Sequence, residues 1–158
     1  MSGAAIYKYN QSLEALHGLH AAKNLGLSFR LNEEAAEEGY HDAILAMGWY
    51  YLNGCGVSRN KEKAKEWYKK SARSGEVRAM YSLGEIAFYE CDYITAKTWF
   101  DRAIHKGHTG SHYMLGKMYW MGRGVQLDRK MAIRLISIAA KKNYPKARRA
   151  IRFLTRKK

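Results

Sequence analysis

The chain of 158 residues contains one proline and two cysteines, and it has no run of 18 apolar residues that could form a transmembrane helix. Its N-terminus lacks the uninterrupted apolar core of a signal peptide. No stretch rich in glycine, serine or proline marks a linker, and no low-complexity stretch occurs. These absences predict a single domain over residues 1–158, and they make the cytoplasm the default compartment.

The chain also lacks the short motifs of common enzymes. It has no G-x-S-x-G sequence, no phosphate-binding glycine loop and no cysteine–histidine pair in a recognisable context. His105, His108 and His112 lie close in sequence, but Gly107 and Gly110 break the segment, so the three imidazoles would not share one helix face. The sequence therefore predicts no enzyme, no catalytic residue, no metal site and no cofactor.

What the sequence does contain is a module that recurs at intervals of 36 and 32 residues. A glycine that follows leucine or methionine marks the three copies, at Gly48, Gly84 and Gly116. Apolar residues at three- and four-residue spacing in both halves of the module predict two antiparallel helices, A and B, in each copy. The sequence thus predicts an all-α fold, an α-α superhelix of about four helix pairs, which is an architecture for binding. The predicted repeats are residues 40–75, 76–107 and 108–143.

The glycine of helix A tolerates the close approach of another helix, at a propensity cost of up to about 1 kcal/mol relative to alanine. We expect Trp67, Trp99 and Leu135 of helix B to be the large residues that offset this cost. The end of each helix B carries a residue that accepts positive φ. These residues are Gly75, Gly107 and Asn143.

Between helices A and B, the first and third repeats share the sequence Y-x-x-G-x-G-V, at residues 51–57 and 119–125. Asn60 and Asp128 follow as expected helix N-caps. With these loops, the chain resembles the Sel-one-like repeat (SLR) family, relatives of the tetratricopeptide repeats, over about residues 28 to 155. The middle repeat departs from the family, because residues 89–93 form a shorter turn without the glycines. The resemblance implies a solenoid that binds proteins or peptides.

The two ends of the chain differ from the repeats. Residues 1–39 are expected to form a divergent helix pair that caps the stack, and residues 144–158 a basic capping helix that opens at Pro145. The length and composition of the chain, taken by themselves, suggest one domain of seven or eight helices. Cys55 and Cys91 occupy matching turns of successive repeats, where the spacing of roughly 8 to 10 Å between stacked helices is too long for a disulfide, so we expect free thiols.

The resemblance implies that helix A lines a concave face, and its binding positions can be counted from the glycine. These positions lie three residues before, one residue after and four residues after it. They combine aromatic side chains with charges of both signs, which suits a peptide. At the last of the three, Leu52, Phe88 and Trp120 could be core or exposed. The candidate partner-binding residues are Leu45, Trp49, Tyr81, Glu85, Tyr113, Lys117, Trp120 and Arg149, with Phe153 at the matching place in the last helix.

Charge is unevenly distributed along the chain, whose formal net charge is +14. Residues 1–42 contain three basic and six acidic residues, whereas residues 129–158 contain twelve basic residues and no acid. Such a basic end attracts acidic protein, nucleic acid or an anionic membrane. It could equally keep the terminal helix soluble and discourage further stacking. The candidate basic patch is Lys141, Lys142, Arg148, Arg149, Arg152 and Arg156.

Three classes of function stay open, the first two implied by the resemblance and the third by the distribution of charge. The first is a non-enzymatic adaptor or scaffold that binds a protein or peptide, acidic in part, on the concave face. The second is an immunity or inhibitor protein that occludes a toxin or enzyme. The third is a basic binder of nucleic acid or of an anionic surface, for which the chain shows charge but no recognised nucleic-acid motif. The oligomeric state and the identity of the partner stay open.

Overall fold

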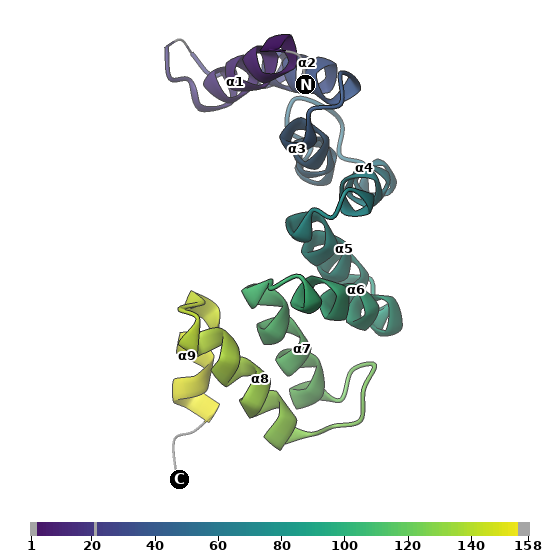
Figure 1. Cartoon of the computed structure of the whole chain (residues 1–158), viewed down its shortest axis with the longest axis vertical. Helices are drawn as coiled ribbons and strands as arrows, with labels where there is room; N and C mark the ends of the chain where they lie inside the picture. Colours follow the sequence, from purple (N-terminus) through teal and green to yellow (C-terminus); the bar gives the residue numbers. More distant parts are fainter. Residues whose placement is uncertain (1–2, 21, 155–158) are drawn as a thin grey trace. The chain divides into compact units, whose positions relative to one another are not determined.

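The computed structural model of the chain describes residues 3–20 and 22–154. In this part every regular element is an α-helix (Figure 1). It contains nine helices, so the expected total of seven or eight was wrong, because both ends contribute complete helices in addition to the three repeats. The helices are α1 (Gly3–His17), α2 (Leu25–Glu37), α3 (His41–Asn53), α4 (Lys61–Arg73), α5 (Val77–Tyr89), α6 (Tyr93–His105), α7 (Thr109–Met121), α8 (Arg129–Lys141) and α9 (Pro145–Leu154).

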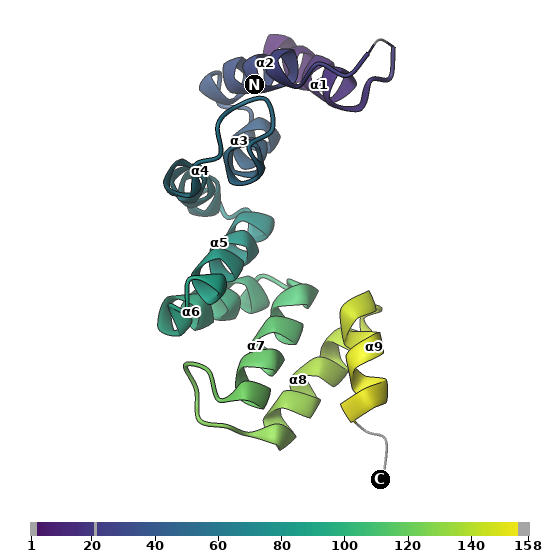
Figure 2. The same cartoon turned by 180° about the vertical axis from the view of Figure 1, so that it is seen from behind.

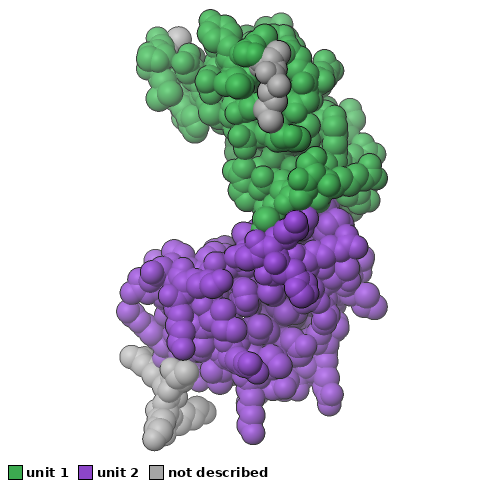
Figure 3. All heavy atoms as spheres, in the orientation of Figure 1, with its two compact units in different colours: residues 1–79 green, residues 80–158 purple. Residues whose placement is uncertain are grey.

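The chain divides into two compact units, residues 1–79 and residues 80–158 (Figure 3). In the first unit, α1 packs on α2, α2 on α3 and α3 on α4. In the second unit, α6 packs on α7, α7 on α8 and α8 on α9, and both views of the ribbon show these last three helices side by side (Figure 2). The prediction of a single domain stays a prediction.

The glycine of each helix A receives a ring or branched side chain from helix B of the same repeat. A Cβ atom built on Gly48 would lie 2.5 Å from the Tyr68 ring, and one on Gly84 would lie 2.5 Å from the Phe100 ring. At Gly116 the neighbour is Ile136, whose Cγ1 atom would lie 2.8 Å away. The close approach at the glycine was therefore predicted correctly, but its partner lies one residue further along helix B than expected.

The residues that were expected to fill this place, Trp67, Trp99 and Leu135, are only half-buried. The two tryptophans lie at the flank of helix B, where each ring is covered by a basic side chain one turn later. The Lys70 ammonium lies 4.8 Å from the Trp67 ring centroid, and the Arg102 guanidinium lies 4.9 Å from that of Trp99. Neighbouring positions on a helix differ by about 100°, so the shift of one residue moves the tryptophan out of the core.

Four asparagine or aspartate side chains start the B helices at the same place in each pair. As predicted, the backbone N–H of Lys63 donates to Asn60 and that of Met131 to Asp128. Asn24 caps α2 and Asp92 caps α6 in the same way. An N-cap of this type contributes about 1 kcal/mol to helix stability. The cap at Asn24 shows that residues before α3 repeat the local geometry of the later pairs.

Glycines in the long loops allow two chain segments to touch. Gly56 and Gly124 have φ values of 70° and 68°, and the predicted helix ends Gly75, Gly107 and Asn143 also have positive φ. A Cβ on Gly56 would collide with the carbonyl of Leu25, at the start of α2. A Cβ on Gly124 would collide with Tyr93, at the equivalent start of α6. The loop of one repeat thus rests on the first residue of the preceding helix B.

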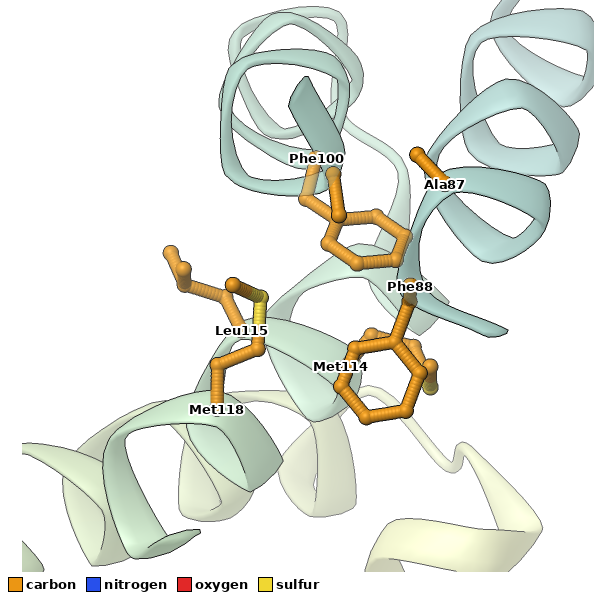
Figure 4. Packing of buried hydrophobic residues seen from close by; sticks show 7 residues of the cluster. Ala87, Phe88, Phe100, Met114, Leu115 and Met118 are labelled. Carbon is orange, nitrogen blue, oxygen red and sulfur yellow. The ribbon is translucent and has the colours of Figure 1, made fainter. Parts of the chain in front are cut away.

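The core of the second unit lies between α5, α6 and α7 (Figure 4). Phe100 is fully buried there, and Phe88 and Met118 are nearly or fully buried beside it. Burial of such large side chains removes apolar surface from water, which stabilises each by about 1.5–3 kcal/mol. The cluster consists of Ala87, Phe88, Ala96, Phe100, Met114, Leu115 and Met118.

The first helix pair replaces this apolar contact with a buried polar one. Ser12 stands at the repeat position of Gly48, and Asn32 stands at that of Tyr68; both are fully buried. The Asn32 amide donates to the backbone carbonyl of Ala43 (3.0 Å), and the Ser28 hydroxyl donates to the carbonyl of Ser12 and lies beside the Tyr50 hydroxyl. The glycine signature is absent from α1 because no ring from α2 needs the space.

Candidate functional site

In the second unit, the residues three positions before the glycine pack against the start of the next helix A. The Tyr81 ring on α5 lies 4.4 Å from the ring of His108, which precedes α7. The Tyr113 ring on α7 lies 5.6 Å from that of Tyr144, which precedes α9. Tyr81 and Tyr113 are half-buried, so they join successive A helices as well as presenting an edge to solvent.

Tyr81 is held by polar contacts in addition to ring packing. Its hydroxyl donates to Oε1 of Glu85 one turn later (2.8 Å). Burial raises the pKa of Tyr81 far above its ordinary value, with the neighbouring Tyr144 hydroxyl and the Glu85 carboxylate acting in the same direction. The side chain therefore stays a neutral hydrogen-bond donor throughout the accessible pH range. Glu85 is consequently partly committed to this contact.

His108 caps α7 with an imidazole instead of a carboxylate or amide. The backbone N–H of Ser111 donates to Nδ1 of His108 (3.2 Å). Burial lowers the pKa of His108, and the nearby His112 lowers it further. Only the neutral ring has a lone pair at Nδ1 to accept this bond, so cap geometry and lowered pKa both favour the uncharged form.

The first unit contains the same ring contact at its own end. Tyr9 of α1 and Tyr40, which precedes α3, have ring centroids 5.0 Å apart. Leu45 holds the matching position of α3 and is half-buried. Tyr40, His108 and Tyr144 were not among the residues expected to take part in this arrangement. Their common place directly before a helix A, two repeat intervals from Tyr40 to His108 and one from His108 to Tyr144, was the signal that could have found them.

The positions one residue after the glycine include two exposed aromatic residues and two half-buried charged ones. In the second unit these are Glu85, Lys117 and Phe153; Phe153 is 72% exposed. The Lys117 ammonium lies 5.1 Å from the Phe88 ring centroid, and this lysine is half-buried. In the first unit, Trp49 holds this position and is 42% exposed.

The positions four residues after the glycine contribute mainly to packing. Phe88 is buried in the core cluster, so of the two alternatives, core or exposed, this residue belongs to the core. Leu52 and Trp120 are half-buried. The Arg129 guanidinium lies 5.3 Å from the Trp120 ring centroid, so this tryptophan pairs with the start of α8.

The basic patch lies on α9 and on the end of α8, and its described members are exposed. Arg149 belongs both to this patch and to the candidate partner-binding residues. Arg156 lies outside the described residues. The acidic run on α2 is partly neutralised, since the Lys8 ammonium lies 2.9 Å from Glu34 and 2.8 Å from Glu38.

No group of three or more histidine, cysteine or acidic side chains within the described ranges could hold a metal ion. His108 is used as a helix cap, and His112 Nδ1 faces the carbonyl of His108 at 3.3 Å. Cys55 and Cys91 carry free thiols. None of the helices described is long and apolar enough to cross a bilayer.

These helices, caps and loops define an all-α helical-repeat protein whose pairs repeat one packing scheme. The Sel1 repeat family model matches residues 41–76, 77–108 and 110–144. The chain belongs to the Sel1 (Sel-one-like) repeat family. Each matched repeat begins and ends within one or two residues of the repeats expected from the sequence.

Two curated relatives are each 31% identical to this chain over the matched region. An uncharacterised protein of Neisseria meningitidis matches 69% of this chain, which is 23% of that protein. HRD3B of Arabidopsis thaliana, an ERAD-associated E3 ubiquitin-protein ligase component, matches 63% of this chain, which is 16% of that protein. The chain thus spans about a quarter or less of the length of these relatives.

Solved structures place the fold in the SLR solenoid class. The protective antigen c5321 of uropathogenic Escherichia coli has a TM-score of 0.83 and 29% identity, with 94% of this chain and 33% of that chain covered. A Sel1 repeat protein of Oxalobacter formigenes has a TM-score of 0.81 and 27% identity, with 90% and 60% covered. An immunity protein of Pseudomonas aeruginosa has a TM-score of 0.50 and 17% identity, with 93% and 69% covered, which is a likeness of fold alone.

Proposed function

We propose that this chain is a non-enzymatic adaptor or scaffold that binds a protein segment on the exposed positions of its A helices. Sel1 repeat solenoids are typically scaffolds for protein interaction, which supports the class of function. The observation that supports the place of binding most strongly is the row of Glu85, Lys117 and Phe153, one residue after the glycine position in the second unit. We call these three residues the inner row.

The inner row offers an exposed aromatic ring and charges of both signs on three successive A helices. Aromatic residues contribute large contact area at interfaces, and charged residues set specificity and the association rate. Trp49 occupies the same repeat position in the first unit and is also exposed. Tyr81 and Tyr113 are half-buried and lie one helical turn before Glu85 and Lys117, so we assign them a positioning role and only partial contact with a partner.

The test is affinity capture of the tagged chain from its native cell, followed by measurement of binding to the purified partner. The variant Lys117→Glu combined with Phe153→Ala should weaken that binding by at least about tenfold, the loss expected when an interface anchor is removed. Lys106→Glu, at the exposed end of α6, makes the same charge change elsewhere in this unit and should bind as the unchanged chain does. Equal binding by all three proteins would refute the proposed place.

Occlusion of a toxin or enzyme stays a hypothesis, since the likeness to an immunity protein concerns the fold alone. If the captured partner is a toxin whose activity is suppressed by this chain, the scaffold function is wrong and the inhibitor function replaces it. Location in the cytoplasm is likewise part of the proposal, and it is consistent with the two free thiols.

A further inference from the structure

The surface between α8 and α9 contains a concavity that belongs to none of the inner-row positions. Its volume is about 370 Å³, near the lower end of the range typical of ligand sites, about 300–1,000 Å³. A smaller depression of about 200 Å³ adjoins it, and Arg148 and Arg152 line both. The residues that line the larger concavity are Ser137, Ala140, Lys141, Arg148, Ile151 and Arg152.

The three cations at this concavity have no internal acidic partner. In the described part of the chain, no acidic side chain forms an ion pair with Lys141, Arg148 or Arg152, and residues 129–158 contain no acid at all. Lys141 lies in the last turn of α8, where a positive charge is favourable. Arg148 lies in the first turn of α9, where the helix dipole disfavours it. Arg152 lies in the last turn of α9, where a positive charge is favourable, so helix stability accounts for Lys141 and Arg152 but not for Arg148.

The concavity cannot receive a helix packed as closely as the helices of the repeats. Arg152 stands one repeat interval after Gly116, at the position where helix A receives helix B. At Gly116 a single Cβ atom would already lie 2.8 Å from Ile136 and 3.1 Å from the carbonyl of Ala132. A complete arginine side chain takes the space that an approaching helix would need. An extended peptide segment is thinner than a helix and does not need this space to be empty.

The floor and the rim of the concavity differ in chemistry. Ala140 and Ile151 supply an apolar floor that fits one apolar side chain, and the guanidinium groups of Arg148 and Arg152 can each take a carboxylate in a bidentate pair. We propose that the α8–α9 concavity binds an extended acidic peptide segment of a partner protein, with one apolar side chain on the floor and carboxylates on the arginines.

The same charges would attract a nucleic acid, but the lining suits it less well. Proteins that bind single strands combine a basic groove with aromatic side chains on which the bases stack. Neither concavity is lined by an aromatic residue. The lining therefore favours a peptide, and nucleic acid becomes an outcome of the test.

The experiment measures fluorescence anisotropy of a labelled peptide of about nine residues, with one leucine between acidic residues on both sides. Arg148→Gln combined with Arg152→Gln should weaken binding by at least about tenfold. Lys130→Gln combined with Arg134→Gln removes the same charge from exposed positions of α8 outside the concavity, and it should change binding by less than about twofold. Circular dichroism checks that both variants fold.

Two further probes separate the outcomes. Replacing the peptide leucine with serine should weaken binding, because the floor loses its apolar contact. Lys117→Gln, in the inner row, should leave binding of the acidic peptide unchanged. The two proposals are therefore tested separately: the concavity can fail to bind the peptide while the inner row binds a partner, and the inner row can fail while the concavity binds the peptide. Equal losses in both double variants would overturn the proposal. Failure of the chain to bind the peptide would also overturn the proposal. If the chain instead binds an oligothymidylate of about 20 nucleotides, and this binding requires Arg148 and Arg152, the concavity takes nucleic acid and the peptide proposal is wrong.

Discussion

Gly84→Ala tests the close contact between helix A and helix B in the second unit. Alanine is the better helix former, and an unobstructed change from glycine to alanine inside a helix stabilises by about 1 kcal/mol. At Gly84 the added Cβ would lie 2.5 Å from Cε1 and 2.7 Å from Cδ1 of Phe100. Real Cβ atoms do not approach a carbon this closely, so either the ring or the helix must move.

The Phe100 ring has little freedom to move, because it is fully buried in the core cluster. Overpacking a tight core costs about 1–3 kcal/mol. Subtracting the propensity gain of about 1 kcal/mol leaves a net loss of up to about 2 kcal/mol from the free energy of unfolding. Gly26→Ala on α2 is the matched control, because the nearest atom to its added Cβ lies 3.8 Å away.

The assay is urea denaturation followed by helix circular dichroism. Gly84→Ala should lower the free energy of unfolding, whereas Gly26→Ala should leave it unchanged or raise it. In a Phe100→Leu background, the same change at Gly84 should cost less, because the flat ring edge is gone. If Gly84→Ala stabilises by about 1 kcal/mol, the close glycine–ring contact does not exist and the packing scheme is wrong.

Three further predictions concern caps and loops. Asp92→Ala should lower the free energy of unfolding by about 0.5–2 kcal/mol, since α6 loses its N-cap; an unchanged urea midpoint would contradict the cap. Gly56→Ala should destabilise the chain, because its φ of 70° is strained for alanine and the Cβ meets the Leu25 carbonyl; equal thermal stability would show that the loop does not rest on α2. Because the pKa of His108 is lowered on folding, its contribution to stability is complete above pH 6.5 and declines as the pH falls from there toward the folded pKa. His108→Asn should remove this dependence in urea titrations between pH 5 and pH 7, and an identical pH profile in the variant would exclude His108 as its source.

The repeat architecture could be predicted from the sequence because backbone requirements recur at fixed intervals. Positive φ at Gly75, Gly107 and Asn143 and the caps at Asn60 and Asp128 depend on local geometry, which single residues report. The partner of the helix A glycine was placed one residue off. An amphipathic helix tolerates a large residue on either side of its apolar face, and only the packed angle between helices decides which one enters the core.

The candidate site could be predicted only in part. Counting from the glycine selected Lys117, which is half-buried, and Phe153, which is exposed, and their role in binding stays a prediction. It could not show that Tyr81 packs on His108 or that Phe88 lies in the core, because both contacts join different helices. The first helix pair was hard to interpret for a related reason, since buried Ser12 and Asn32 replace the apolar signature there.

The central claim is that the inner row of the A helices holds a partner protein. Hydrogen–deuterium exchange of the chain alone and in complex with its captured partner tests this claim directly. We expect slower exchange in the complex for the C-terminal halves of α5 and α7 and for α9, with α6 unchanged. Protection confined to α6 and α8, with α5 and α7 unchanged, would contradict the claim that the inner row holds the partner.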